Sequence, residues 1–150
     1  MHWIFRVYEM KYRVFLDTNV FIYSYEFQDS NSGKIIELLN DEHIEAVISE
    51  RVVKEVYRYF RKYHGKDLAD TFRKYLYESC RIVLARDVKD AMNRYRGQIK
   101  EKDLEQLAVV REFGIKYLIA LDRDFDGKEE YRTPKEFVKL LCGKTKESEY

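Results

Sequence analysis

Acidic side chains follow two of the most apolar segments of the 150-residue sequence. Asp17 comes directly after residues 11–16, and Asp122 and Asp124 come directly after residues 117–121. Both segments are short and rich in β-branched or aromatic residues, a pattern that predicts strands. In parallel α/β sheets, ligands bind beyond the carboxyl ends of the strands. We therefore expect these carboxylates to meet, although they lie far apart in the sequence.

Two further acids lie on expected helices. Asp103 lies in the first turn of a helix expected over residues 103–113, which leads into the second of these strands. Glu55 lies within a longer helix, where Arg51 and Arg58 share its side because they stand four residues before it and three after it. Glu55 is thus flanked by cations at the border of the apolar face.

The chemistry that fits these acids is divalent-metal binding. Clustered carboxylates repel one another and need cations. The three histidines are scattered, and the two cysteines have no metal-type spacing. Oxygen ligands alone select Mg²⁺ or Mn²⁺, which support displacement at phosphorus. The arginines expected to hold a phosphodiester backbone beside the acids are Arg51, Arg58 and Arg123.

Each acid taken alone also has a purely structural interpretation. Asp17 could cap a helix, and an acid at Asp103 is favoured by the helix dipole. Glu55 could pair with an arginine on its own helix. The segment from Asp122 to Gly127 could be a solvated turn. The order and spacing of the four acids together favour the chemical interpretation.

The elements that must position these acids alternate between strand and helix. This alternation predicts an α/β fold with a parallel sheet covered on both faces. Ser32, Ser49 and a Thr133–Pro134 capping box are expected to begin three of the helices. The expected strands are 11–16, 44–48, 81–85 and 117–121, and the expected helices are 20–23 onward, 32–39, 50–63, 66–78, 88–95, 103–113 and 134–141.

Composition limits the remaining choices. A net charge of +1 gives no global attraction to nucleic acid, so a polyanion must meet a local basic patch. We predict one domain over residues 1–150, with its core at 11–141 and a tail at 143–150. No apolar run is long enough for a membrane span or a signal peptide, which favours the cytoplasm. The 37% of charged residues is typical of thermophilic proteins.

Four motifs together resemble the PIN-domain nucleases, including VapC-like single-domain ribonucleases. The first is a hydrophobic strand followed by Asp-x-Asn, and the last is a strand ending in Asp-x-Asp-Phe. The motifs are VFLDTNVFI at 14–22, SERVVKEV at 49–56, DLEQLA at 103–108 and YLIALDRDF at 117–125. The sequence departs from the family at Ala120, where a Ser or Thr often stands. Residues 1–10 precede the usual start of such domains, as an added edge strand or a start-site extension.

The resemblance implies a three-layer α/β/α sandwich with about five parallel strands and metal-dependent hydrolysis of single-stranded or structured RNA. Many small members are homodimeric toxins that an antitoxin inhibits, so RNA, a second copy and an antitoxin are the expected partners. The implied roles are metal binding by Asp17, Asp103 and Asp122, completion of the pocket by Glu55 and Asp124, and orientation of Asp17 by Thr18 and Asn19.

Two alternatives remain open from the sequence. A haloacid-dehalogenase-like phosphatase also places an Asp after its first strand, but it needs a second acid two residues later, where this chain has Asn19. The other alternative is a domain that binds RNA or assembles without useful turnover, which the missing hydroxyl at Ala120 would permit. Cleavage of RNA separates both from the nuclease.

Overall fold

A five-stranded parallel sheet forms the centre of the computed structural model, which describes residues 11–146. The strand order is β3-β2-β1-β4-β5. The three-layer α/β/α fold with about five strands is confirmed, and the fifth strand, which the sequence pattern does not predict, has only two residues. The strands are β1 (Tyr12–Leu16), β2 (Ile44–Ser49), β3 (Cys80–Val83), β4 (Tyr117–Ile119) and β5 (Tyr131–Arg132).

Strand β1 lies in the middle of the sheet, between β2 and β4. Val14, Phe15 and Leu16 are fully buried, because helices cover both faces of the sheet. Val14 is in register with Tyr117 of β4, and Leu16 with Ile119. This register brings the carboxyl ends of β1 and β4 side by side.

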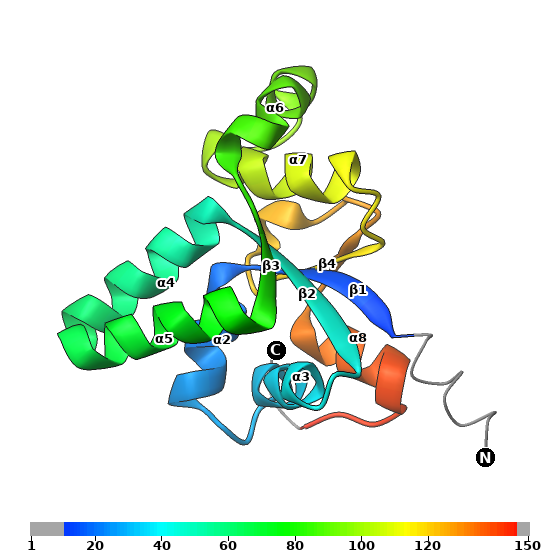
Figure 1. The fold of residues 1–150 in the computed structure, drawn as a ribbon. Coiled ribbons are helices and arrows are strands. Elements are labelled where there is room, and N and C mark those ends of the chain that lie inside the picture. The colour runs from blue at the N-terminus through cyan, green and yellow to red at the C-terminus, as the bar shows by residue number, and fades with distance from the viewer. Residues whose placement is uncertain (1–10, 147–150) are drawn as a thin grey trace, which may run out of the picture.

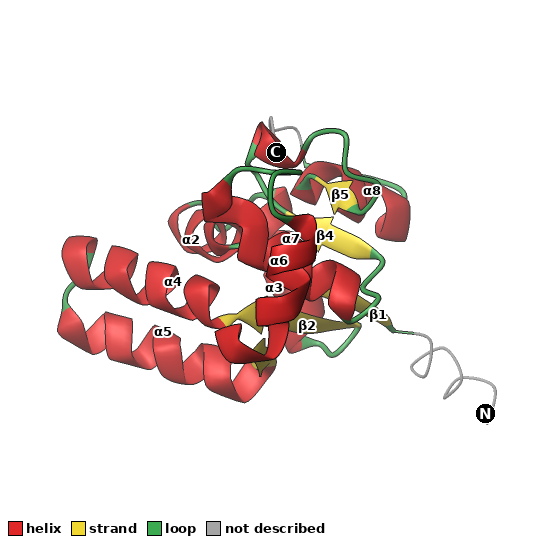
Figure 2. Ribbon diagram, turned by 90° about the horizontal axis from the view of Figure 1, so that it is seen from above, coloured by secondary structure: helices red, strands yellow, loops and turns green. Residues whose placement is uncertain are grey.

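Helices lie on both sides of the sheet (Figure 1). Helices α6 and α7 cover one face, and α2, α3 and α8 lie on the other. Helices α4 and α5 pack side by side and project from the body (Figure 2). The helices are α2 (Thr18–Glu26), α3 (Asn31–Asn40), α4 (Glu50–Tyr63), α5 (Lys66–Ser79), α6 (Lys89–Tyr95), α7 (Leu104–Glu112) and α8 (Pro134–Cys142), with short 3₁₀ turns at η1 (Ala85–Val88), η2 (Glu101–Asp103) and η3 (Arg123–Phe125).

Two of the three expected helix starts are confirmed. The Ser49 hydroxyl accepts a hydrogen bond from the Val52 amide and begins α4. Thr133 and Glu136 form the reciprocal capping box that begins α8. These contacts satisfy backbone donors that the first turn of a helix leaves free.

The expected start at Ser32 is wrong, because Ser30 caps α3. The Ser30 backbone is extended, and its hydroxyl accepts a hydrogen bond from the Gly33 amide. A β-carbon at Gly33 would lie 2.2 Å from the carbonyl oxygen of Gln28, so only glycine fits this tight turn. Ser32 is instead fully buried inside the helix.

The described residues enclose one hydrophobic core, which runs from Val14 to Val138 along the chain. No helix within residues 11–146 has the length and apolar character that crossing a bilayer requires. The predicted edge strand or extension at residues 1–10 lies outside the described residues, as do the last four residues of the predicted tail.

Candidate active site

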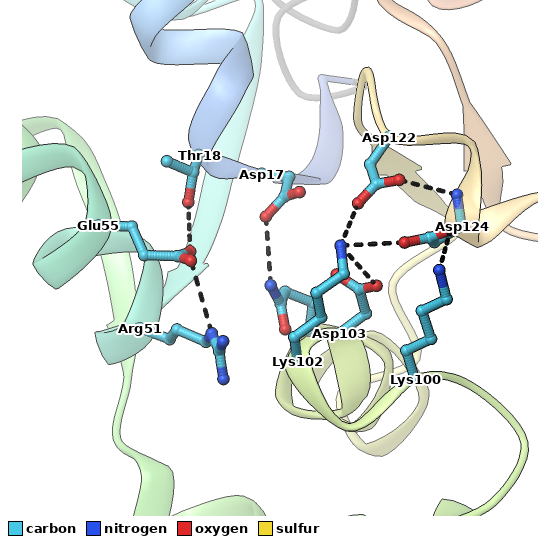
Figure 3. A network of polar contacts seen from close by, with 10 residues as sticks. Asp17, Thr18, Arg51, Glu55, Lys100, Lys102, Asp103, Asp122 and Asp124 are labelled. Atoms are coloured by element: carbon cyan, nitrogen blue, oxygen red, sulfur yellow. Dashed lines mark hydrogen bonds and ion pairs between the residues drawn. The ribbon is translucent and has the colours of Figure 1, made fainter. Parts of the chain in front are cut away.

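The neighbouring ends of β1 and β4 bring distant acids together. Asp17 follows β1, and its backbone amide donates a hydrogen bond to the carbonyl oxygen of Ile119 in β4 at 3.0 Å. Asp122 lies three residues beyond Ile119. The predicted convergence at the carboxyl edge of the sheet is therefore present, and the side chains of Asp17, Asp103 and Asp122 face the same region (Figure 3).

Asp103, Asp122 and Asp124 form the tightest group of acids in the described chain. Each offers a carboxylate oxygen, and these atoms lie within 4.8 Å of one another. The Asp122 carboxylate accepts the Asp124 amide at 2.9 Å, which holds the η3 turn in shape. Phe125 is fully buried at the end of that turn and anchors it to the core. The turn is thus a fixed support for two carboxylates.

Two lysines contact this acidic group. Lys102 Nζ lies 2.8 Å from Asp122 Oδ2, 2.9 Å from Asp124 Oδ2 and 3.5 Å from Asp103 Oδ2. Hydrogen bonds to Asp122 and Asp124 raise the pKa of the Lys102 ammonium above its usual range. Lys100 Nζ contacts Asp124 Oδ1 alone, at 3.0 Å. Both lysines hold the pKa of Asp124 below its usual value.

The Asp17 side chain is buried at the carboxyl end of β1. Its carboxylate accepts a hydrogen bond from Gln106 Nε2 at 3.4 Å. Burial is the main cause that raises the pKa of Asp17 from 3.8 to about 6, and the charges of Glu55 and Asp103 add to the rise. Hydrogen bonds from Gln106 and the Thr18 backbone oppose it. A nearby cation would stabilise the ionised form.

Within residues 11–146, Asp103 has a buried oxygen that forms no hydrogen bond and is contacted only by the Lys102 ammonium, at 3.5 Å. Only 4% of this residue is exposed, and its Oδ2 atom forms no hydrogen bond within the described chain. Burial, together with the charge of Asp122, raises the pKa of Asp103, while Lys102 lowers it. A buried carboxylate oxygen in this state favours a further positive partner.

Glu55 reaches the same region from α4. Its carboxylate accepts the Thr18 hydroxyl at 2.7 Å and pairs with Arg51 at 3.6 Å. Thr18 does contact Asp17 as expected, but through its backbone, because its hydroxyl bonds Glu55. Asn19 is exposed, and within residues 11–146 no hydrogen bond joins it to Asp17. It lines a shallow hollow with Ile22, Tyr23, Leu121 and Asp122.

The three predicted phosphate-binding arginines are separated in the structure. Arg51 is tied to Glu55, while its backbone amide donates to Glu105. Arg123 is exposed and lies 3.9 Å from Asp126, pointing to its own turn. Arg58 is exposed on α4 and lines a groove between α4 and α5. The structure therefore does not gather all three at the carboxylates.

This set of groups fits a divalent cation. The donors are carboxylate oxygens, as Mg²⁺ and Mn²⁺ prefer, and the buried Asp103 oxygen in this group forms no hydrogen bond to the described residues. An ammonium group already contacts the three carboxylates, which shows that their arrangement accepts positive charge. The residues that could hold the ion are Asp17, Asp103, Asp122 and Asp124, with Glu55 beside them.

The sequence interpretation missed two side chains of the site. Gln106 fixes Asp17, and it stands three residues after Asp103, on the same side of α7. That spacing was an available signal. Lys102 adjoins Asp103 in sequence, but the direction of its side chain depends on the η2 turn, and no residue pattern predicts that turn.

Comparison with solved structures shows the same fold in other proteins. Among the structures that match are three of low identity, and no curated protein matches the sequence. A toxin–antitoxin complex from Klebsiella pneumoniae is 21% identical over 82% of this chain and 98% of that chain, with a TM-score of 0.65. VapC20 from Mycobacterium tuberculosis, described as a sarcin-ricin loop cleaving toxin, is 19% identical over 75% and 92%, with a TM-score of 0.58. VapBC2 from Rickettsia felis, bound to a promoter DNA fragment, is 15% identical over 81% and 98%, with a TM-score of 0.63.

A family model gives the assignment at the level of the sequence. It is the model of the PIN domain, and it matches residues 13–124. This range contains Asp17, Glu55, Asp103, Asp122 and Asp124. Since the match covers well over half of the 150 residues, the chain belongs to the PIN domain family.

Proposed function

We propose that this protein is a Mg²⁺- or Mn²⁺-dependent endoribonuclease. The observation that carries the proposal is that the acid after β1, one acid each from α4 and η2, and the acids of the turn after β4 meet at one edge of the sheet of a PIN domain. Membership of this family removes the haloacid-dehalogenase-like alternative. The cytoplasm is the proposed cellular location of the protein.

Asp17, Asp103 and Asp122 are the proposed metal-binding residues, with Asp124 and Glu55 completing the acidic pocket. A divalent ion held there would polarise the phosphate and lower the pKa of water for attack at phosphorus. The protein's own groups fix the carboxylates in advance. Gln106 holds Asp17, the Asp124 amide holds Asp122, and the Thr18 hydroxyl with Arg51 holds Glu55. Such outer contacts keep ligand oxygens oriented without substrate.

The groove between α4 and α5 is the proposed path for single-stranded RNA next to the acids. It encloses about 600 Å³. Four of its cations come from one side of α4, and none of them has an ion pair within the described chain: Lys54, Arg58, Arg61 and Lys62. Tyr57 and Tyr77 also line it, and Arg73 stacks 4.3 Å from the centre of the Tyr57 ring. Unpaired cations beside tyrosines suit phosphates and stacked bases.

Arg58 connects this groove to the acidic pocket, because it follows Glu55 by one turn of α4. Arg51 and Arg123 remain proposed RNA contacts at the pocket itself. Arg123 is exposed and held by one long ion pair, so it is free to turn toward a phosphate.

The structural relatives extend the proposal to partners. One is described as a toxin–antitoxin complex, one as VapBC2 bound to a DNA fragment from their promoter, and one as a sarcin-ricin loop cleaving toxin. By analogy, we propose that this protein also acts as a toxin and that an antitoxin blocks its acidic pocket. We further propose that it forms a homodimer. Size-exclusion chromatography with light scattering tests the dimer.

Cleavage of RNA by the purified chain tests the proposed activity. We expect cleavage with Mn²⁺ or Mg²⁺, none with a chelator, and a loss of at least about 100-fold in Asp103→Asn with its circular dichroism unchanged. Asp90→Asn, an exposed acid on α6, is the matched control and should cleave normally. Products should carry 5′-phosphate and 3′-hydroxyl ends, because water rather than the 2′-hydroxyl attacks. RNA binding without cleavage would favour the non-enzymatic alternative.

A further inference from the structure

One lysine occupies the centre of the acidic pocket. The Lys102 ammonium contacts Asp122 Oδ2 at 2.8 Å, Asp124 Oδ2 at 2.9 Å and Asp103 Oδ2 at 3.5 Å (Figure 3). These are the three residues whose oxygens lie close enough together to hold one metal ion. The ammonium and a divalent ion therefore compete for the same carboxylates.

The two cations also exclude each other electrostatically. A divalent ion within a few ångströms of an ammonium is repelled by it, and the Asp122 and Asp124 oxygens that Lys102 contacts at 2.8 and 2.9 Å are occupied in part by that ammonium. Carboxylates this close need positive charge when no metal is bound. Lys102 supplies that charge from within the chain.

Displacing Lys102 is feasible because it is only partly buried. Its side chain is 51% exposed and comes from the short η2 turn, so the ammonium can move into water when its flexible stem rotates. Ion pairs at this degree of exposure are weak individually. A divalent ion with two charges and several oxygen ligands can therefore replace it.

Lys100 provides an internal comparison. It has the same side chain, lies two residues away, and also pairs with Asp124. Its ammonium contacts Asp124 Oδ1 alone and is 66% exposed, outside the space shared by the three acids. Removal of Lys100 changes the local charge by the same amount as removal of Lys102 but leaves that space filled.

We propose that Lys102 is an internal counter-ion that holds the acidic pocket together in the metal-free protein and must leave before a divalent cation binds. This inference rests on the proposed metal-dependent function. Its consequence is that Lys102 weakens the metal affinity that the acids alone would give. The site would then load its metal only at higher concentration, or together with RNA, whose phosphate oxygens can complete the ligands of Mg²⁺.

Titration calorimetry of the full chain with MnCl₂ tests this, at pH 7.5 and constant salt. We expect Lys102→Met to lower the dissociation constant for Mn²⁺ by about 5- to 30-fold, as expected if up to three weak ion pairs no longer have to be broken. Lys100→Met should change it by less than about threefold. Lys102→Arg, which keeps the charge, should stay near the wild-type value.

Melting temperatures without metal give a second readout. Lys102→Met should melt lower than wild type when a chelator is present and gain more from added Mn²⁺, because its carboxylates lack their counter-ion. If Lys102→Met does not fold, Lys102→Gln replaces it in both measurements. Equal dissociation constants for wild type and the neutral variant, or weaker binding by the variant, overturn the inference while metal binding stands. Failure of every variant and wild type to bind Mn²⁺ would overturn the proposed metal dependence as well.

Discussion

Replacement of Asp17 by Asn should stabilise the metal-free protein, and by an amount that depends on pH. Asp17 is 7% exposed, and burial raises its pKa from 3.8 to about 6. The native state thus binds this proton more tightly than the unfolded chain does. The stability that neutral Asp17 gives is present below about pH 4 and is lost as pH rises through about 6. An Asn at this position never pays for ionisation and still offers an oxygen to Gln106.

The size of the effect follows from the two pKa values. Ionisation of Asp17 costs native stability about 3 kcal/mol at pH 7.5 but only about 0.5 kcal/mol at pH 4. Asp17→Asn should therefore raise the free energy of unfolding by up to these amounts, and raise the melting temperature at pH 7.5 by about 6–12 °C.

Urea unfolding with a chelator, at pH 4 and pH 7.5, measures this difference. Asp126→Asn, an exposed acid on a nearby turn, is the control and should change stability by less than about 0.5 kcal/mol at either pH. Added Mn²⁺ should stabilise wild type and not Asp17→Asn. A variant that is less stable than wild type at pH 7.5, or a gain that is the same at both pH values, would refute the reasoning.

Three other substitutions test the supports of the site. Thr18→Val removes the hydrogen bond to Glu55 at similar volume and should cost roughly tenfold in RNA cleavage, measured as an initial rate, with little loss of stability. Phe125→Ala empties a fully buried position beneath the η3 turn and should destabilise the fold by about 3–5 kcal/mol in urea unfolding. Thr133→Ala removes the side-chain cap of α8 without touching a candidate ligand, so it should cost about 0.5–2 kcal/mol and leave Mn²⁺ affinity unchanged by calorimetry.

RNA binding tests the groove between α4 and α5. The double substitution Arg58→Ala and Arg61→Ala should weaken binding of single-stranded RNA in a fluorescence anisotropy titration and reduce its salt dependence by about two counterions. Lys139→Ala, an exposed cation on α8, is the matched control. Equal weakening by the control would show that only the overall charge matters.

The sequence was most informative where chain topology alone decides position. Asp17 and Asp122 could be predicted to meet because each follows an apolar strand, and parallel strands share a carboxyl edge. Glu55 and Asp103 could be proposed from their positions on expected helices, the PIN motifs supported both, and the structure brings them to the same region. The function of these acids stays a prediction from chemistry and family.

Side-chain direction was the part that the sequence could not supply. The Thr18 hydroxyl bonds Glu55 rather than Asp17, since the geometry of the first turn of α2 decides which carboxylate it reaches. Lys102 enters the pocket through a short 3₁₀ turn that has no periodicity. Strand β5 has two residues, too few for an alternating pattern. Ser30 and Ser32 are both serines and could cap a helix equally well, so only the backbone conformation decides that Ser30 begins α3.

Anomalous diffraction from crystals soaked in MnCl₂ tests the central claim most directly, because it locates the ion itself. We predict an Mn²⁺ peak among the carboxylates of Asp17, Asp103 and Asp122, with the Lys102 ammonium moved out of the pocket. A fully ordered Lys102 still bound to Asp122 and Asp124, with Mn²⁺ absent from these carboxylates at saturating concentration, would contradict it.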